Sequence, residues 1–228
     1  MLFRSGSADL ESIEPTQVAG FNQLFDDPAG TRAHGAGVGL DQKIAKWTYA
    51  GVEALWRDSR WVQGLETQPA LPGGAGNRVF HLLARERSLR GHLYQVLNRR
   101  TTATAEYILH DREDDGSEFG DGSDGRSRTH RVRLGINYFD PQGWFTGFGA
   151  TWRRQRLEGF ETADGVADGA RDFWLLDATV GYQFPQRTGY VAFTFNNLLD
   201  QDFRYRAVGI DQRFLPDFSV NFRLSLNF

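Results

Sequence analysis

Residues 218–228 read Phe-Ser-Val-Asn-Phe-Arg-Leu-Ser-Leu-Asn-Phe, and this stretch decides the fold class. Apolar and polar residues alternate in it without exception, and successive side chains of a strand point to opposite sides. The apolar set is Phe218, Val220, Phe222, Leu224, Leu226 and Phe228. A tilted strand needs roughly 9–11 residues to cross a bilayer. The stretch therefore predicts a membrane-spanning β-strand.

The same alternation recurs upstream. The clearest strands are expected at residues 130–139, 144–156, 171–184 and 191–195, and weaker ones at 16–25, 33–44, 50–56, 87–97 and 101–112. Residues 77–87, with Leu82 and Leu83, are compatible with a helical turn. The pattern predicts an all-β, antiparallel transmembrane β-barrel of about ten strands, as part of a larger barrel.

The expected connections alternate in length. Short turns fall near residues 45–46, 98–100, 140–143 and 185–187, whereas long polar or glycine-rich loops fall at 59–86, 113–126, 157–170 and 199–213. Outer-membrane barrels have short periplasmic turns and long extracellular loops. The alternation therefore indicates a bacterial outer-membrane location, with outer-membrane lipid as a partner.

Aromatic residues mark two levels on these strands, as in the girdles of a membrane barrel. The predicted interface aromatics are Trp47, Trp56, Trp144, Trp152, Trp174 and Tyr182. The alternative is a soluble β-sandwich binding module, in which Phe218, Phe222 and Phe228 would be buried against a second sheet. Its other face would then hold charges such as Arg131 and Arg153, and unpaired buried charges are costly.

Composition excludes several other classes of protein. The formal net charge of −3 argues against a nucleic-acid partner, and the absence of cysteine excludes disulfides, Cys-ligated metals and thiol catalysis. No apolar run is long enough for a membrane-spanning helix, and no signal-peptide core follows Met1.

Phe195-Asn-Asn-Leu-Leu-Asp200, followed by Phe203 and Tyr205, resembles the penultimate-strand signature of TonB-dependent receptors. Pro216 before the last strand and the final Phe228 also resemble that family. The terminal alternation resembles the signal that the barrel assembly machinery reads in outer-membrane barrels generally. The resemblance covers about the last 40 residues and implies import of a scarce nutrient, such as a metal chelate, with TonB as a partner.

The chain departs from that family because it has room for neither a plug domain nor twenty-two strands, and no TonB box is recognisable. We expect residues 1–15 to be a disordered or truncated segment and residues 16–228 to be the barrel segment. TonB would then act through a missing N-terminal region. The alternatives are the barrel of a surface-polysaccharide exporter, a passive porin, or a complete ten-stranded barrel enzyme in which residues 16–25 pair with the last strand.

No residue set indicates catalysis, a cofactor or a metal, so the prediction is a protein that is not an enzyme. Asp111, Glu113 and Asp115 have the spacing of a calcium loop, but Gly122 occupies the position of its bidentate acid. The acidic segment 111–125 is expected to be a solvated loop. The five histidines are scattered. Inward arginines are expected to form lumenal salt bridges with acids including Glu53, Glu106 and Asp177.

Overall fold

The computed structural model describes residues 12–18, 21–27, 31–66, 77–115, 125–159, 169–203 and 217–226. Regular structure within them is β-strand, apart from one short 3-10 helix. The elements are β1 (Ser12–Val18), β2 (Phe21–Asp27), β3 (Arg32–Ala45), β4 (Thr48–Glu66), β5 (Asn77–Val96), β6 (Thr101–Asp115), β7 (Gly125–Phe139), β8 (Trp144–Glu158), β9 (Gly169–Gln183), η2 (Pro185–Arg187), β10 (Gly189–Asn196) and β11 (Ser219–Leu226).

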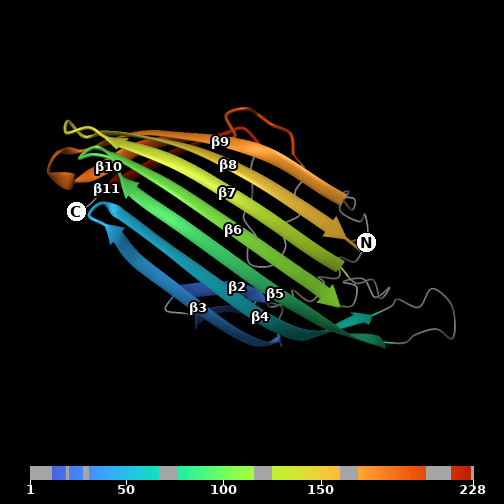
Figure 1. The fold of residues 1–228 in the computed structure, drawn as a ribbon. Coiled ribbons are helices and arrows are strands. Elements are labelled where there is room, and N and C mark those ends of the chain that lie inside the picture. Colours follow the sequence, from blue (N-terminus) through green and yellow to red (C-terminus); the bar gives the residue numbers. More distant parts are fainter. Residues whose placement is uncertain are drawn as a thin grey trace, which may run out of the picture.

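Nine strands, β3 to β11, form one antiparallel sheet in which each strand pairs with the next along the chain. Figure 1 shows this meander as a row of long arrows, side by side and alternating in direction, from β3 to β9. The predicted all-β antiparallel architecture is confirmed. In the described part of the chain β3 and β11 are the two edges, so the sheet is an open one.

The first two strands differ from the prediction. Residues 16–25 were expected to form one strand, but β1 and β2 pair with each other as a separate two-stranded sheet. Val18 and Phe21 are register partners across that hairpin. The alternation of Val18, Phe21 and Phe25 therefore reflects two short strands, and among the described residues neither pairs with β11.

The segment 77–87 is also extended rather than helical. It begins β5, and Asn77 pairs with Glu66 at the far end of β4. Leu82 and Leu83 consequently point to opposite faces of a strand. Pairing along the whole of β4 supplies the backbone hydrogen bonds that a local helical turn would otherwise supply, and the predicted loop 59–86 is correspondingly too long.

Short and long connections lie at opposite ends of the sheet, as predicted (Figure 1). The short ones join β3 to β4, β5 to β6, β7 to β8 and β9 to β10. In the turn after β7, the Asp140 amide donates to the Trp144 carbonyl at 2.7 Å. Gly143 adopts φ +102°, and a Cβ there would lie 2.6 Å from the Gln183 carbonyl oxygen. This turn requires glycine.

The buried side chains of the nine-stranded sheet share one face. Apolar members include Leu55, Ala84, Phe173 and Leu175, and they alternate with buried polar residues on the same strands. Among the described residues, no helix is long and apolar enough to cross a membrane.

Candidate functional site

The two faces of the sheet have opposite chemistry, and the charged face is the buried one. We call the face that carries Arg57, Glu86, Glu106, Arg131 and Arg153 the polar face. The opposite side is the apolar face. Arg131 is 3% exposed and Arg153 is 2% exposed, whereas Leu134, on the strand of Arg131, is 49% exposed. A soluble protein places these residue types the other way round.

The apolar face extends across the sheet, and every strand except β6 exposes a large apolar side chain on it. It exposes large side chains from the first edge to the last: Val38, Leu40, Val52, Trp56, Leu89, Leu93, Leu134, Ile136, Phe148, Trp174, Phe193, Val220, Phe222, Leu224 and Leu226. Phe193 and Phe222 are register partners with ring centroids 5.2 Å apart. The predicted burial of Phe218 and Phe222 in a soluble sandwich is not seen, because both side chains are exposed. Phe228 lies outside the described residues.

The predicted interface aromatics occupy the two ends of this apolar face. Trp47 and Trp144 are exposed beside short turns, and the Trp144 and Tyr182 rings lie 5.2 Å apart. Trp152 and Trp174 are register partners on β8 and β9, nearer the long connections, and Trp56 is exposed on β4. The tryptophans thus bracket the exposed aliphatic side chains of the apolar face.

On the polar face, Glu86 joins three strands. Its two carboxylate oxygens accept hydrogen bonds from Arg57 at 3.3 Å and from Arg112 at 3.2 Å. Arg112 also donates to Asp114 at 2.7 Å. Glu86 is 2% exposed, so these ion pairs offset the cost of burying its charge.

A second carboxylate organises the polar face nearer the short turns. Glu106 accepts a hydrogen bond from Arg90 at 2.7 Å and one from Arg131 at 3.1 Å. The predicted pairing of inward arginines with Glu106 is therefore confirmed for Arg131. Asp177, another predicted partner, instead accepts the backbone N–H of Asn197 at 3.1 Å.

Asn197 fixes the segment that resembles the receptor signature. Its side chain accepts from the Gln201 amide and donates to the Gln201 carbonyl, each at 3.1 Å. Asp200 then accepts the Phe218 amide at 3.4 Å, immediately before β11. The residues of the resemblance thus connect the end of β10 to the start of β11.

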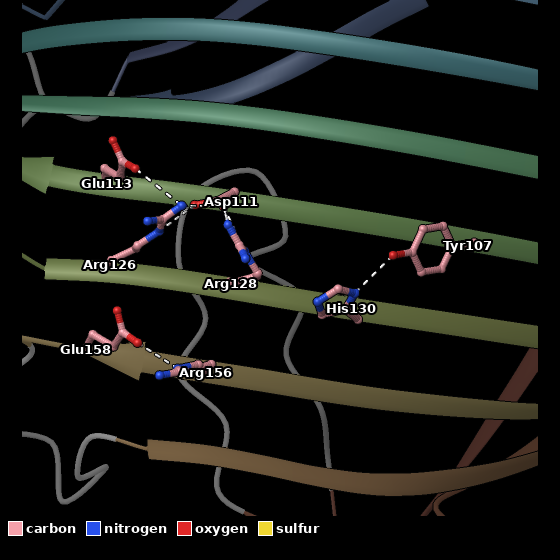
Figure 2. A network of polar contacts seen from close by, with 8 residues as sticks. All are labelled: Tyr107, Asp111, Glu113, Arg126, Arg128, His130, Arg156 and Glu158. Atoms are coloured by element: carbon pink, nitrogen blue, oxygen red, sulfur yellow. Dashed lines mark hydrogen bonds and ion pairs between the residues drawn. The ribbon is translucent and has the colours of Figure 1, made fainter.

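Past Trp152 and Trp174, the apolar face gives way to a charged belt that includes Asp111, Glu113, Arg126, Arg128 and Arg156 (Figure 2). Asp111 accepts from Arg126 Nη2 at 3.0 Å and from Arg128 Nε at 2.9 Å. Arg126 also lies 3.5 Å from Glu113. Partial burial raises the pKa of Asp111, but the hydrogen bonds from Arg126 and Arg128 outweigh that effect and hold the pKa below its usual range.

This belt corrects the expectation of an acidic loop at residues 111–125. The strand β6 continues to Asp115. Asp111 and Glu113 both lie against the Arg126 guanidinium of β7, and they do not converge as the ligands of a calcium ion would. Within the described residues, no three His, Asp or Glu side chains are arranged to hold a metal ion. The histidines remain dispersed. His130 Nδ1 shares a hydrogen bond of 2.9 Å with the Tyr107 hydroxyl, and His92 Nε2 lies 2.9 Å from Asp41 Oδ1.

Sequence reasoning missed Glu86, Arg57 and Arg90. Glu86 stands between Arg85 and Arg87, so both faces of the strand carry charge there. The sequence therefore does not show which face is buried. Only the register of β4, β5 and β6, which places Arg57 and Arg112 opposite Glu86, identifies its role.

Comparison with protein-family models, with curated proteins and with solved structures finds no match to this chain.

Proposed function

We propose that the chain forms part of the wall of a bacterial outer-membrane β-barrel, in a transporter like the TonB-dependent receptors that imports a scarce nutrient such as a metal chelate. The apolar face would meet lipid, and the polar face would line the lumen. The short turns would lie in the periplasm and the long connections outside the cell.

The reversed polarity of the sheet carries this proposal. An apolar face exposed on eight of the nine strands, opposite a face of paired buried charges, costs free energy in water, whereas lipid favours it. Burial of Arg131 and Arg153 among polar groups suits a hydrated or ion-paired interior.

The strand dimensions support the same assignment. Trp144 and Trp152 lie eight residues apart on β8, which corresponds to about 27 Å along the strand and roughly 20 Å along the normal of a membrane at a 40–45° tilt. That span is close to the height of the apolar band of outer-membrane barrels, about 25 Å. The backbone of β6 to β9 continues beyond it into the charged belt.

The receptor assignment rests on the resemblance at residues 195–228 and on the contacts of Asn197 and Asp200, which give those motif residues a structural role. An arginine-lined passive pore is the second candidate. It is favoured by Arg131 and Arg153, which are register partners on the polar face. Conductance across a planar bilayer without TonB or an energy source would favour the pore over the receptor.

The first test is refolding of the purified chain with and without detergent. We expect aggregation in plain buffer and strand-dominated circular dichroism in micelles, because the apolar face needs a nonpolar phase. A monodisperse, folded monomer without detergent would overturn the membrane assignment. A gel mobility that changes on heating would indicate that the strands close into a barrel without further chain.

For the transport step, the gene is tested in cells with its natural upstream sequence. Uptake of a labelled ferric chelate should require both this gene and TonB. Uptake that persists without TonB would contradict the receptor assignment.

A further inference from the structure

A shallow hollow crosses the apolar face over β3 to β6. Its volume is about 550 Å³, within the range of small-molecule sites. Small side chains, Ala36 and Ala54, lie beneath it, and larger ones, Trp56, Leu89 and Leu109, line it. The hollow therefore has the size and the apolar lining to accommodate an alkyl chain.

One end of the hollow is polar. Arg87 and Asp111, which are register partners on β5 and β6, are the two charged residues of its lining. Arg85 follows two residues away on the same face, about 7 Å further along the strand. Arg85 and Arg87 are both exposed, and neither forms an ion pair with any residue that the structure describes.

The acidic residue at this end does not cancel the two cations. Asp111 is already hydrogen-bonded by Arg126 and Arg128 from the neighbouring strand (Figure 2). Glu113, the register partner of Arg85, lies 3.5 Å from Arg126. Asp58, the register partner of Arg85 on β4, is a third carboxylate on this face. Four arginines, Arg85, Arg87, Arg126 and Arg128, thus stand against Asp58, Asp111 and Glu113. One positive charge remains in excess, and Arg85 and Arg87 form no ion pair with the described residues, so an anion can bind them.

We propose that this hollow binds one membrane lipid with a phosphate head group, its acyl chain over Ala36 and Ala54 and its phosphate on Arg85 and Arg87. This inference rests on the proposed function, because it requires the apolar face to meet lipid. A phospholipid joins an apolar chain to an anion, so its chain matches the apolar hollow and its phosphate matches the cationic end.

A second copy of this chain fits the site less well. Its belt carboxylates, Asp111 and Glu113, already lie against Arg126, so a second copy offers no free anion to Arg85 and Arg87. A phosphorylated lipid brings the complementary charge.

The test uses the full chain refolded in zwitterionic micelles, with lipid retention measured by native mass spectrometry. The probes are phosphatidic acid, phosphatidylcholine and diacylglycerol with identical acyl chains. We expect preferential retention of phosphatidic acid. The double variant R85Q/R87Q should lower that retention by about fivefold for each arginine removed.

The matched control is R99Q/R100Q, which removes the same charge from the exposed short turn between β5 and β6 and should leave retention unchanged. Ala54→Trp should reduce lipid retention by filling the hollow, and inorganic phosphate in excess should not displace the lipid. Equal retention by R85Q/R87Q and R99Q/R100Q would overturn the proposal. Full displacement by inorganic phosphate, with no effect of Ala54→Trp, would also overturn it by indicating an anion site without a lipid chain.

The two proposals fail in different ways. A folded micellar chain that does not discriminate among the three lipids contradicts only the lipid site. A chain that folds as a soluble monomer without micelles contradicts the membrane assignment and the lipid site together.

Discussion

Arg131 on β7 and Arg153 on β8 lie directly opposite each other in the register, and both side chains are buried on the polar face. Like charges at opposed positions of a sheet repel, so this arrangement needs neighbouring anions. Glu106 supplies one, 3.1 Å from Arg131. The polar face is thus stabilised by Glu86 and Glu106, each of which pairs with two arginines. Substitution of either carboxylate should therefore destabilise the sheet.

Replacing Glu106 should destabilise the sheet strongly. Glu106→Gln would leave Arg90 and Arg131 without their shared carboxylate, and breaking a largely buried pair on one side costs about 3 kcal/mol. Urea-dependent unfolding of the refolded chain in micelles measures this loss. The control is Glu158→Gln, whose partner Arg156 is well exposed, and it should change the free energy of unfolding by less than about 1 kcal/mol. Equal effects of the two variants would contradict the ion-paired interior.

A charged residue placed on the apolar face should destabilise the chain in lipid. Leu134 is exposed on β7 between Ala105 and Ala150. Leu134→Arg should lower the stability of the chain in lipid vesicles by about 1–4 kcal/mol, because arginine on the lipid face costs more the nearer it lies to the bilayer midplane. The measurement is the denaturant midpoint for folding into vesicles.

Asn137→Arg is the matched control for that variant, because it places the same charge on the same strand but on the polar face, opposite Gly147. We expect an effect below about 1 kcal/mol for this lumenal substitution. A larger loss from Asn137→Arg than from Leu134→Arg would reverse the assignment of the two faces.

Gly143 should be intolerant of any side chain. Its φ of +102° disfavours other residues, and a Cβ would press against the Gln183 carbonyl. Gly143→Ala should therefore cost roughly 2 kcal/mol or more, measured by the same unfolding assay. Gly91→Ala provides the comparison, because a Cβ there meets no atom within 4 Å. An equally large loss at Gly91 would indicate that the strands, rather than the turn, demand glycine.

The charged belt should keep its central ion pairs in acid. Asp111 lies in register with Arg156, four residues past Trp152 on β8, outside the part of β6 that we propose to span the membrane, and its pKa is lowered. A lowered pKa stabilises the fold above the unfolded value, and that contribution is lost as the pH falls through the folded value. The stability difference between the parent chain and Asp111→Asn should persist down to pH about 4, the ordinary aspartate value, and close only below it.

Asp172→Asn is the control for this titration, since Asp172 is exposed and forms no ion pair with the described residues. It should change the free energy of unfolding by less than about 0.5 kcal/mol. A difference for Asp111→Asn that closes already above pH about 5 would mean that Arg126 and Arg128 do not hold the carboxylate as the structure has it.

Much of the fold was predictable because a strand between an apolar and a polar environment has alternating apolar and polar residues along its sequence. Residues 171–184 and 218–228 show this contrast, and their described parts form β9 and β11 with the expected faces. The prediction was wrong for residues 77–87, where Arg85, Glu86 and Arg87 place charge on both faces. It was also wrong for residues 111–115, because their acidic composition suggested a loop while cross-strand arginines stabilise a strand.

The sequence by itself determined the architecture: an antiparallel all-β chain with one apolar face, short turns at one end and long connections at the other. Period-two alternation and turn residues are local properties, and a linear sequence records them directly. The tertiary structure alone decided the partners. The pairing of Glu106 with Arg90 and Arg131, the opposition of Arg131 and Arg153, and the meeting of Ala36, Ala54 and Arg87 in one hollow all depend on the register between strands. Register is set by the whole sheet at once, because a shift of one residue would exchange the two faces of a strand.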